Sequence, residues 1–420
     1  MERKKIDDIK LGDYILDIAA GPFGSNLKVD CFVNDGFPII DGANLKGFKV
    51  TDNITKYVSE VKARSLHRSI ARRNDVIVTI SGNVGQISYI PSNSKYEEYL
   101  VSQRQFRVTF DTTKVYVPYL IYYFHTKVGQ HKILSFANQT GVPALAQPLK
   151  NFRNIDICFP ELRVQKRIAS ILDSLDSKIE LNNRINHNLE EQAQALYKSW
   201  FVDFEPFKDG KFVESELGMI PEGWSTSTIQ ALSDRIASGG TPKSTNISFY
   251  DGPVKWFTTK ELKDGFLFDS EKHISKNAVE SSATKIFPMG TVLMAIYASP
   301  TVGRLGILTS ESSFNQASVA ILPKHNIGSE YIFLHLLSER DRLNNLASGA
   351  AQQNLNVGIV KNYPVLYPTP DVLISFNSIT KQLFSKIRNN SSENCCLIEM
   401  RDSLLSKLMS GELKINEIDC

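Results

Sequence analysis

The sequence predicts an α+β protein that contains an internal repeat. In this fold, two similar mixed α/β domains are separated by two long antiparallel coiled-coil helices, related by a pseudo-two-fold axis. Three observations predict it: motifs of the first half recur in the second, strand-like runs separated by turn residues fill both halves, and each half ends in a long stretch of helical periodicity. The 420 residues, 42% of them hydrophobic, suffice for two cores.

The repeat joins a segment from about residue 20 to about residue 200 with one from about 237 to about 411. Gly21-Pro22-Phe23-Gly24-Ser25 corresponds to Gly239-Gly240-Thr241-Pro242. Gln103 corresponds to Gln316, and Gly141 to Gly349. The glycine segments are either ligand-binding loops or plain turns, and the two glutamines either read a ligand or brace the domain core.

Apolar runs rich in β-branched and aromatic residues predict strands in both globular parts. The expected strands are 37–40, 76–80 and 106–110 in the first part and 254–257, 292–296 and 319–322 in the second. Short helices are expected at 119–125 and 331–337.

Two long stretches repeat apolar residues at alternating intervals of four and three, which predicts a coiled coil. The first places Ile168, Leu172, Leu175, Ile179, Asn182, Asn186, Leu189, Ala193, Leu196 and Trp200 at core positions. The second places Val372, Phe376, Ile379, Leu383, Lys386, Asn390, Glu393, Leu397, Met400 and Leu404 there. A helix of about 36 residues spans about 54 Å, enough to hold two domains apart.

Both stretches turn polar at their middles, at Asn182 with Asn186 and at Lys386 with Asn390. Polar core positions at matching heights would fix the register of two helices packed side by side. The alternative is two unrelated amphipathic helices, each packed on its own domain.

Composition limits the class of protein. No run approaches the ~20 apolar residues of a membrane span, and the first residues lack the apolar core of a signal peptide. Five scattered cysteines without a Cys-x-x-Cys pair disfavour disulfides and zinc, and fit a reducing cytoplasm. The net charge of +3 does not by itself identify a nucleic-acid partner.

One basic run is a local exception. Residues 64–73 place Arg64, Arg68 and Arg72 four residues apart, so a helix would gather them on one face. The run is either a phosphate-binding face or a solvated surface.

Two segments stand out in the middle of the chain, Leu196-Tyr197-Lys198-Ser199-Trp200-Phe201-Val202-Asp203-Phe204-Glu205-Pro206-Phe207 and Ser215-Glu216-Leu217-Gly218-Met219-Ile220-Pro221-Glu222-Gly223-Trp224. Together they resemble the central region of the specificity (S) subunits of type I restriction-modification systems. The C-terminal segment resembles residues 404–413, and the starts of the two conserved helices resemble residues 160–169 and, more weakly, 368–374. The second start lacks the Gln165-Lys166-Arg167 of the first, so partner docking there is expected to differ in detail.

The resemblance implies a DNA-recognition subunit that is not itself an enzyme. Two target recognition domains would each bind one half of an asymmetric split DNA sequence, with the two helices as an antiparallel spacer. The implied partners are double-stranded DNA, two modification (methyltransferase) subunits and restriction (translocase and nuclease) subunits, in the cytoplasm and without a membrane. S-adenosylmethionine, ATP and magnesium would belong to the partner subunits, and no cofactor to this chain.

The implied domain boundaries follow the motifs. They are target recognition domain 1 at 1–160, the first spacer helix at 161–205, a central linker at 206–224, target recognition domain 2 at 225–369, the second spacer helix at 370–413 and a tail at 414–420. Spacer and partner contacts are expected from Ile168, Leu172, Leu175, Ile179, Leu189, Leu196, Trp200, Phe376, Ile379, Leu383, Leu397 and Leu404.

Candidate DNA-binding residues are polar and basic side chains near the glycine loops and in the turns. Lysine and arginine bind phosphates, while arginine, lysine, asparagine and glutamine also read base edges. The candidates in the first domain are Ser25, Asn26, Lys28, Lys46, Arg64, Arg68, Asn83, Gln103, Arg104, Gln139, Thr140 and Gln147. In the second domain they are Thr241, Lys243, Ser244, Lys260, Thr301, Arg304, Gln316, Gln352, Gln353 and Asn354.

Other functions find little support in the sequence. The Asn/Asp-Pro-Pro-aromatic string of an adenine methyltransferase and the phosphate-binding loop of an ATPase are both absent. Glu261-Leu262-Lys263 with Asp251 has the spacing of a metal-dependent nuclease, although so short a pattern recurs by chance at Glu412-Leu413-Lys414. The remaining alternative is a two-domain scaffold that binds proteins without reading DNA.

Overall fold

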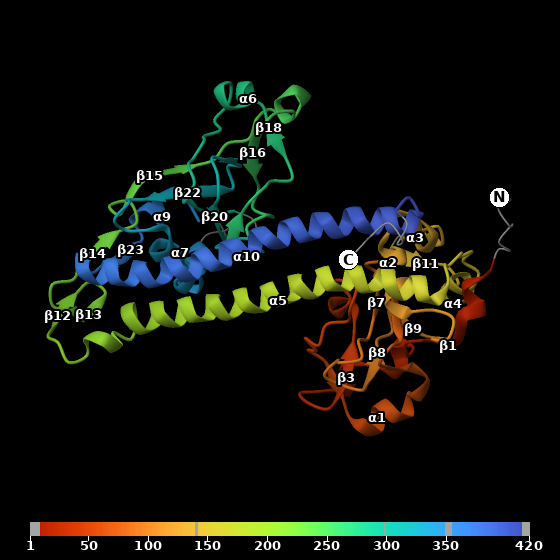
Figure 1. Ribbon diagram of the computed structural model, residues 1–420. Helices are drawn as coiled ribbons and strands as arrows, with labels where there is room; N and C mark the ends of the chain where they lie inside the picture. The colour runs from red at the N-terminus through yellow and green to blue at the C-terminus, as the bar shows by residue number, and fades with distance from the viewer. Residues whose placement is uncertain (1–8, 139–141, 298–299, 349–354, 414–420) are drawn as a thin grey trace. The chain divides into compact units, whose positions relative to one another are not determined.

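The computed structural model describes residues 9–138, 142–297, 300–348 and 355–413 (Figure 1). They form two compact units, divided between residues 178 and 179 and again between 396 and 397. Each unit contains one globular part together with stretches of both long helices. The long helices thus contribute to both units, and the spacer segments expected at 161–205 and 370–413 stay a prediction. Among the described residues, none of the helices has the length and apolarity to cross a membrane.

The first unit contains two sheets. One has the strand order β1-β9-β6-β7, formed by β1 (Ile15–Ala20), β9 (Gln105–Phe110), β6 (Val76–Thr79) and β7 (Ile87–Tyr89). The other has the order β2-β4-β3-β8-β5, formed by β2 (Phe32–Val33), β4 (Tyr57–Val58), β3 (Phe37–Ile40), β8 (Glu98–Val101) and β5 (Ile70–Arg72). Helices α1 (Glu60–Ser65), α2 (Val117–His125), α3 (Lys127–Leu134) and α4 (Pro148–Arg153) complete it, with the short pair β10 (Ala137–Asn138) and β11 (Ala144–Leu145).

The second unit repeats this arrangement. Its larger sheet has the order β15-β22-β19-β20-β17, formed by β15 (Ser233–Ser238), β22 (Ser318–Pro323), β19 (Val292–Ala295), β20 (Leu305–Leu308) and β17 (Gly265–Leu267). The smaller sheet contains β18 (His273–Ile274), β16 (Val254–Phe257) and β21 (Ser313–Phe314). Its helices are α6 (Lys276–Glu280), α7 (Ser329–Ser338), α8 (Arg340–Ser348) and α9 (Val357–Asn362). Two ribbons, β12 (Phe212–Ser215) with β13 (Gly218–Pro221) and β14 (Ser225–Thr228) with β23 (Pro364–Tyr367), complete the unit.

The strand order confirms the internal repeat. Strands β1, β9, β6 and β7 occupy the same order as β15, β22, β19 and β20. Both first strands carry a register shift at their start, between Ile15 and Asp17 and between Ser233 and Arg235. The smaller sheets share a parallel pair, β3 with β8 and β16 with β21. The expected strands and short helices are confirmed, and most of their apolar side chains are buried in both copies.

The two long helices are α5 (Leu162–Phe201) and α10 (Pro370–Ser410) (Figure 1). In each unit a stretch of α5 packs antiparallel to a stretch of α10. In the first unit Ile168, Ala169 and Leu172 share a buried cluster with Leu405 and Leu408. In the second unit Ala193, Tyr197 and Phe201 share one with Phe376 and Phe384. The alternative of two helices that do not meet is therefore wrong.

The core positions expected in α5 are all buried or half-buried. The register expected in α10 is right at six core positions, which are buried or half-buried, and wrong by one residue at the four that alternate with them. Ile379, Lys386, Glu393 and Met400 are exposed, while the next residues, Thr380, Ile387, Asn394 and Arg401, face inward. The stripe mixes apolar with polar side chains, so hydrophobicity alone favoured exposed Ile379 over buried Thr380 and exposed Met400 over half-buried Arg401.

The polar middles of the helices meet in the second unit. Asn390 donates a hydrogen bond to Asn186 Oδ1 at 2.9 Å, and Asn182 donates to Asn394 Oδ1 at 2.9 Å. Asn394 in turn donates to Asn183 Oδ1 at 2.9 Å. Lys386 takes no part because of the one-residue shift, and Asn394 replaces it. Since buried amides tolerate few alternative partners, this cluster fixes the helix register.

Candidate nucleic-acid interface

The glycine loops are sites of close backbone approach rather than plain turns. A Cβ on Gly21 would lie 1.9 Å from the carbonyl oxygen of Ser102, and one on Gly239 would lie 2.3 Å from that of Asn315. Gly21 also donates its amide hydrogen bond to Gln105 O, as Gly239 does to Ser318 O. Only glycine permits this packing. Each loop is therefore fixed against the turn that carries Gln103 or Gln316.

Gln103 and Gln316 are exposed, so the expectation that they might brace the core is wrong. Each side chain lies against its glycine loop. A Cβ on Gly24 would be 2.7 Å from Gln103 Oε1, and Thr241 donates a hydrogen bond to Gln316 Oε1. The repeat thus presents one exposed side-chain amide beside one glycine loop in each unit.

A cleft of about 570 Å³ opens in the first unit, where the ends of β3 and β6 meet the β8–β9 turn. Three candidates, Asn83, Gln103 and Arg104, lie on its exposed rim. Lys56 also lies there and pairs with Asp41 at 2.7 Å. Burial of the Asp41 carboxyl opposes its ionisation, but the hydrogen bonds from Lys56 and the Ala43 amide outweigh burial and lower its pKa.

Buried polar side chains form the floor of the cleft. Thr79 and Gln105 are 1% and 2% exposed and are cross-strand partners in β6 and β9. Thr79 donates to Gln86 Oε1 at 3.2 Å, Gln86 donates to Gly42 O at 3.3 Å, and Ser102 donates to Gln105 Oε1. Sequence reasoning missed these floor residues because they belong to buried strand positions. The signal that could have found them was the pair of polar residues, Thr79 and Gln105, at the ends of apolar strands.

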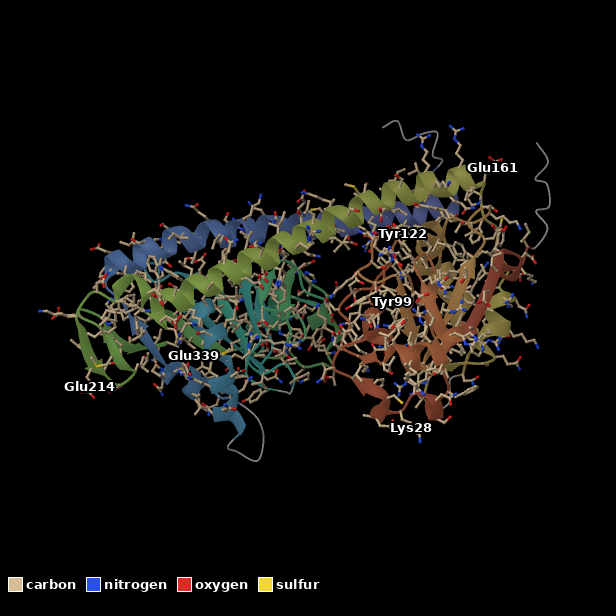
Figure 2. The ribbon with its side chains drawn as sticks, turned by 90° about the horizontal axis from the view of Figure 1, so that it is seen from below. Lys28, Tyr99, Tyr122, Glu161, Glu214 and Glu339 are labelled. Atoms are coloured by element: carbon tan, nitrogen blue, oxygen red, sulfur yellow. The ribbon has the colours of Figure 1, made fainter. Side chains whose placement is uncertain are left out.

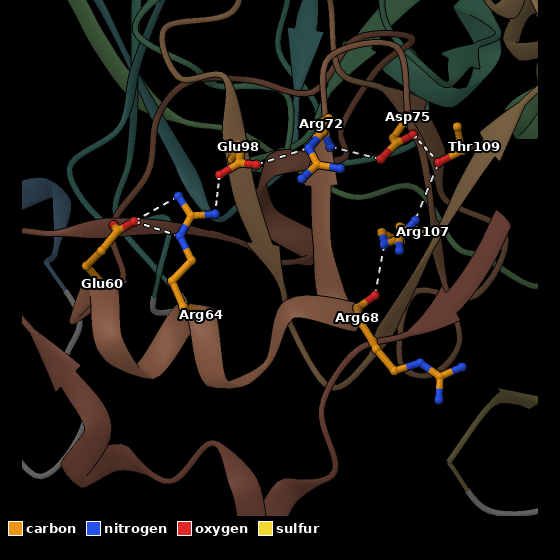
Figure 3. Close-up of polar contacts among 8 residues, drawn as sticks. All are labelled: Glu60, Arg64, Arg68, Arg72, Asp75, Glu98, Arg107 and Thr109. Carbon is orange, nitrogen blue, oxygen red and sulfur yellow. Dashed lines mark hydrogen bonds and ion pairs between the residues drawn. The ribbon is translucent and has the colours of Figure 1, made fainter.

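The basic run 64–73 does not form the helical face expected for it. Arg64 lies in the last turn of α1, Arg68 lies in a 3-10 turn (His67–Ser69), and Arg72 is the last residue of β5. Glu98 receives hydrogen bonds from Arg64 at 2.5 Å and Arg72 at 3.0 Å, and Arg64 also pairs with Glu60 (Figure 3). Burial opposes ionisation of Glu98, but the two arginines outweigh burial and lower its pKa. Two of the three charges are thus neutralised within the domain.

Arg68 differs because only its backbone joins this network. Its carbonyl oxygen accepts a 2.9 Å hydrogen bond from Arg107 Nε, while its exposed side chain points away (Figure 3). Arg107 is 9% exposed and pairs with Asp17 at 2.6 Å, a hydrogen bond that lowers the pKa of Asp17. Thr109, beside Arg107, donates to Asp75, whose pKa is raised by burial. Arg107 therefore holds the backbone of the turn at Arg68, while the charged Arg68 side chain stays exposed.

The other candidates of the first unit lie on its surface. Ser25, Asn26 and Lys28 are exposed in the segment that follows Gly24, and Lys28 is labelled in Figure 2. Lys46 is exposed, and Gln147 is exposed with a left-handed backbone (φ 42°) at the start of α4. Asn26 and Arg68 line a second hollow of about 340 Å³ beside Gly21. Gln139, Thr140 and Gly141 lie outside the described residues.

In the second unit, Thr241, Lys243 and Ser244 are exposed after the glycine loop. Thr241 and Ser244 line an open hollow of about 720 Å³ with Trp256 and Lys272. Lys260 is exposed, and Thr301 and Arg304 are half-buried in the β19–β20 turn. Gly349, Gln352, Gln353 and Asn354 lie outside the described residues. The described candidates of this unit thus lie either in the segment that follows the glycine loop or in turns that follow strands.

Glu261, the residue considered for a nuclease, has a structural role. Its carboxylate accepts hydrogen bonds from the Thr258 amide at 2.7 Å, the Thr258 hydroxyl at 2.8 Å and the Glu271 amide at 2.9 Å. These contacts occupy both oxygens. Within the described residues, no three His, Cys, Asp or Glu side chains are grouped so that they could hold a metal ion.

The long helices and the β12–β13 hairpin carry exposed apolar side chains. On the helices they include Leu181, Ile374, Ile379, Ile398 and Met400, and on the hairpin Val213, Leu217 and Met219. The other expected spacer residues, Leu175, Ile179, Leu189, Leu196, Trp200, Leu383, Leu397 and Leu404, are half-buried.

Comparison with known proteins identifies the family. A family model described as the type I restriction modification DNA specificity domain matches residues 24–191 and again 221–373. The MjaIX type I restriction enzyme specificity subunit of Methanocaldococcus jannaschii is 26% identical over 370 residues, covering 86% of this chain and 82% of the relative. The HindI specificity subunit of Haemophilus influenzae is 26% identical over 396 residues, covering 77% and 84%.

A solved structure has the same fold. The crystal structure of a type I restriction-modification S subunit from M. genitalium superposes with a TM-score of 0.58 at 14% identity, covering 97% of this chain and 98% of that one. The first match covers most of the first globular part and of α5, and the second covers the second globular part and only the start of α10. This chain is a member of the type I restriction-modification specificity subunit family, whose function is DNA sequence recognition.

Proposed function

We propose that each globular part reads one half of a bipartite DNA target, and that the chain performs no chemistry itself. The observation that carries the proposal is the repeated reading surface, in which a glycine loop and an exposed glutamine recur at equivalent places of both sheets. Direct readout needs such side chains at the protein surface, where they can enter a groove. Two copies on one chain suit a split site.

The half-sequences read by the two parts are expected to differ. At equivalent places of the two repeats the first part has Arg104 where the second has Ala317, while the glutamines before them, Gln103 and Gln316, are shared. A change from arginine to alanine removes a donor for guanine or phosphate. The target is therefore asymmetric, and the scaffold role without DNA readout finds no support in the family membership.

We assign the spacer role to α5 and α10, and partner docking to their exposed apolar residues and to the β12–β13 hairpin. Apolar side chains on a polar surface favour protein contacts. Two modification subunits would dock there and carry S-adenosylmethionine, and restriction subunits would bring ATP and magnesium chemistry. The cytoplasm, where the DNA lies, is the proposed location.

An exchange of the first globular part tests the proposal. Residues 1–160 of this chain would be replaced by the matching segment of a relative with another target, and the modified bases of the host genome would be mapped. We expect one half of the methylated motif to change and the other half to stay. A change in both halves, or in neither, would refute the assignment of one half-site to each part.

A further inference from the structure

The cleft of the first unit has the chemistry of a site for a single nucleobase. Its lining includes the apolar side chains of Leu27, Phe32 and Ile39, which share one cluster. It also includes the neutral amides of Gln86 and Gln105. Flipped bases are held by this combination, with apolar contacts on the ring face and hydrogen bonds to its polar edge. A volume of about 570 Å³ exceeds that of one base and leaves room for its sugar.

The floor is built and has hydrogen-bonding capacity to spare. Gln105 is 2% exposed, and its Oε1 is occupied by Ser102. Among the described residues its Nε2 has one long contact, 3.5 Å to Thr79 Oγ1. An amide nitrogen carries two hydrogens, so Gln105 can donate one to a base and keep its contacts with Ser102 and Thr79. Arg104 and Lys56 on the rim supply positive charge for the phosphates beside such a base.

The second unit provides an internal comparison. The cross-strand pair Thr79 and Gln105 corresponds to Ala295 and Ser318 in β19 and β22. Ala295 belongs to a buried apolar cluster with Phe257 and Phe314, which come from the smaller sheet. Apolar packing thus joins the two sheets where the first unit has a polar cleft. The cleft is therefore a feature of one reader rather than a requirement of the repeated fold.

We infer that this cleft accepts one unpaired nucleobase from the half-site that the first part reads, with Gln105 donating to its polar edge. The inference rests on the proposed function and deepens it. Reading by extrusion differs from groove reading in its energetics. A base already unpaired by a mismatch costs less to extrude, so a mismatch there strengthens binding, whereas a reader of the groove loses contacts.

The test uses the full chain and short duplexes that contain the methylated motif. A single mismatch is placed in turn at each base pair of the first half-site, excluding the pair that is methylated. We expect tighter binding, by about 10-fold, at one position, and unchanged or weaker binding at the others. 2-Aminopurine at that position should become brighter on binding, because it leaves the base stack. If no mismatch tightens binding and no probe brightens, the inference is wrong.

Two variants connect the effect to the cleft. In Gly42→Ala the added Cβ would lie 3.3 Å from Gln86 Oε1 and 3.5 Å from Gln105 Nε2, which narrows the floor. Gln105→Met removes the donor. Both should abolish the gain from the mismatch. Gly47→Ala is the matched control, because its Cβ meets nothing within 4 Å, and it should keep the gain. A gain that survives in folded Gly42→Ala would overturn the assignment to this cleft. If the wild-type chain bound duplexes with base-pair substitutions in either half-site as tightly as the intact motif, that result would instead contradict the proposed function.

Discussion

Asn390 in α10 donates a hydrogen bond of 2.9 Å to Asn186 in α5, and both side chains are buried, 6% and 7% exposed. Because each amide has its partner on the opposite helix, sliding one helix along the other would bury amides without partners. A buried polar group without a partner costs about 1–3 kcal/mol. This pair therefore fixes the alignment of the two helices in the second unit.

Asn390→Ala should lower the free energy of unfolding by about 1–3 kcal/mol, because Asn186 would lose its donor. The double variant Asn186→Ala/Asn390→Ala should lose less than the sum of the single losses. Chemical denaturation measures these energies. Asn188→Ala is the control, since Asn188 is exposed and its loss should change stability by less than about 0.5 kcal/mol. Additive losses in the double variant would show that the two asparagines are not coupled.

His335 should make stability depend on pH. Burial lowers the pKa of His335 to about 4 from an ordinary 6.5. Pro364 O, which can only accept, lies 3.1 Å from Nε2, so Nε2 carries the proton and Nδ1 accepts from Tyr197 at 2.9 Å. The unfolded chain binds a proton more readily, so stability is full above pH 6.5 and falls towards pH 4, by about 3 kcal/mol at most.

Denaturation at several pH values measures this effect. His335→Gln should flatten the loss of stability between pH 6.5 and 4. The exposed His187, which lies 3.4 Å from Glu191, is the control, and His187→Gln should leave the slope as in the wild type. If stability fell with pH as steeply in the His335 variant as in the wild type, another group would cause the pH dependence.

Gly21→Ala should impair DNA recognition by the first globular part, and Gly239→Ala should impair recognition by the second. Their Cβ atoms would collide with the backbone of the turn that carries Gln103 or Gln316. Each substitution should cost about 1–3 kcal/mol and reduce discrimination in one half-site, because the loop must move. Binding to duplexes with substitutions in either half measures this. Gly265→Ala, with open space around its Cβ, should bind as the wild type does. Equal effects on both half-sites would argue against separate readers.

Arg304→Ala tests a direct contact in the second reader. If Arg304 reads a base, the variant should lose about 1–3 kcal/mol of discrimination in one half-site only. An equal loss against all sequences, with a smaller salt dependence, would make Arg304 a phosphate contact. Arg342→Ala is the control in the same unit, since Arg342 is exposed and pairs with Glu339.

The sequence predicted the repeat, the central strands and the core face of α5, because most of those positions are apolar and regularly spaced. In α10 it failed at every second core position, where Thr380 and Asn394 are buried and Ile379 and Met400 are exposed. It also failed at residues 64–73, where Glu98, distant in sequence, determines the contacts of Arg64 and Arg72. The sequence offered Asn83, Gln103 and Arg104 as separate candidates, but that they share a cleft, and that Thr79 pairs with Gln105 at its floor, depends on the pairing of distant strands.

The central claim is that two readers on one chain are spaced by α5 and α10. Insertion of one heptad into each helix, at matching positions of the antiparallel pair, keeps the core pattern and lengthens the spacer by about 10 Å. Sequencing of modified bases then gives the motif methylated in the host. We expect both half-sequences to persist while the gap between them grows by about three base pairs, at ~3.4 Å each. An unchanged gap with full methylation would contradict the account.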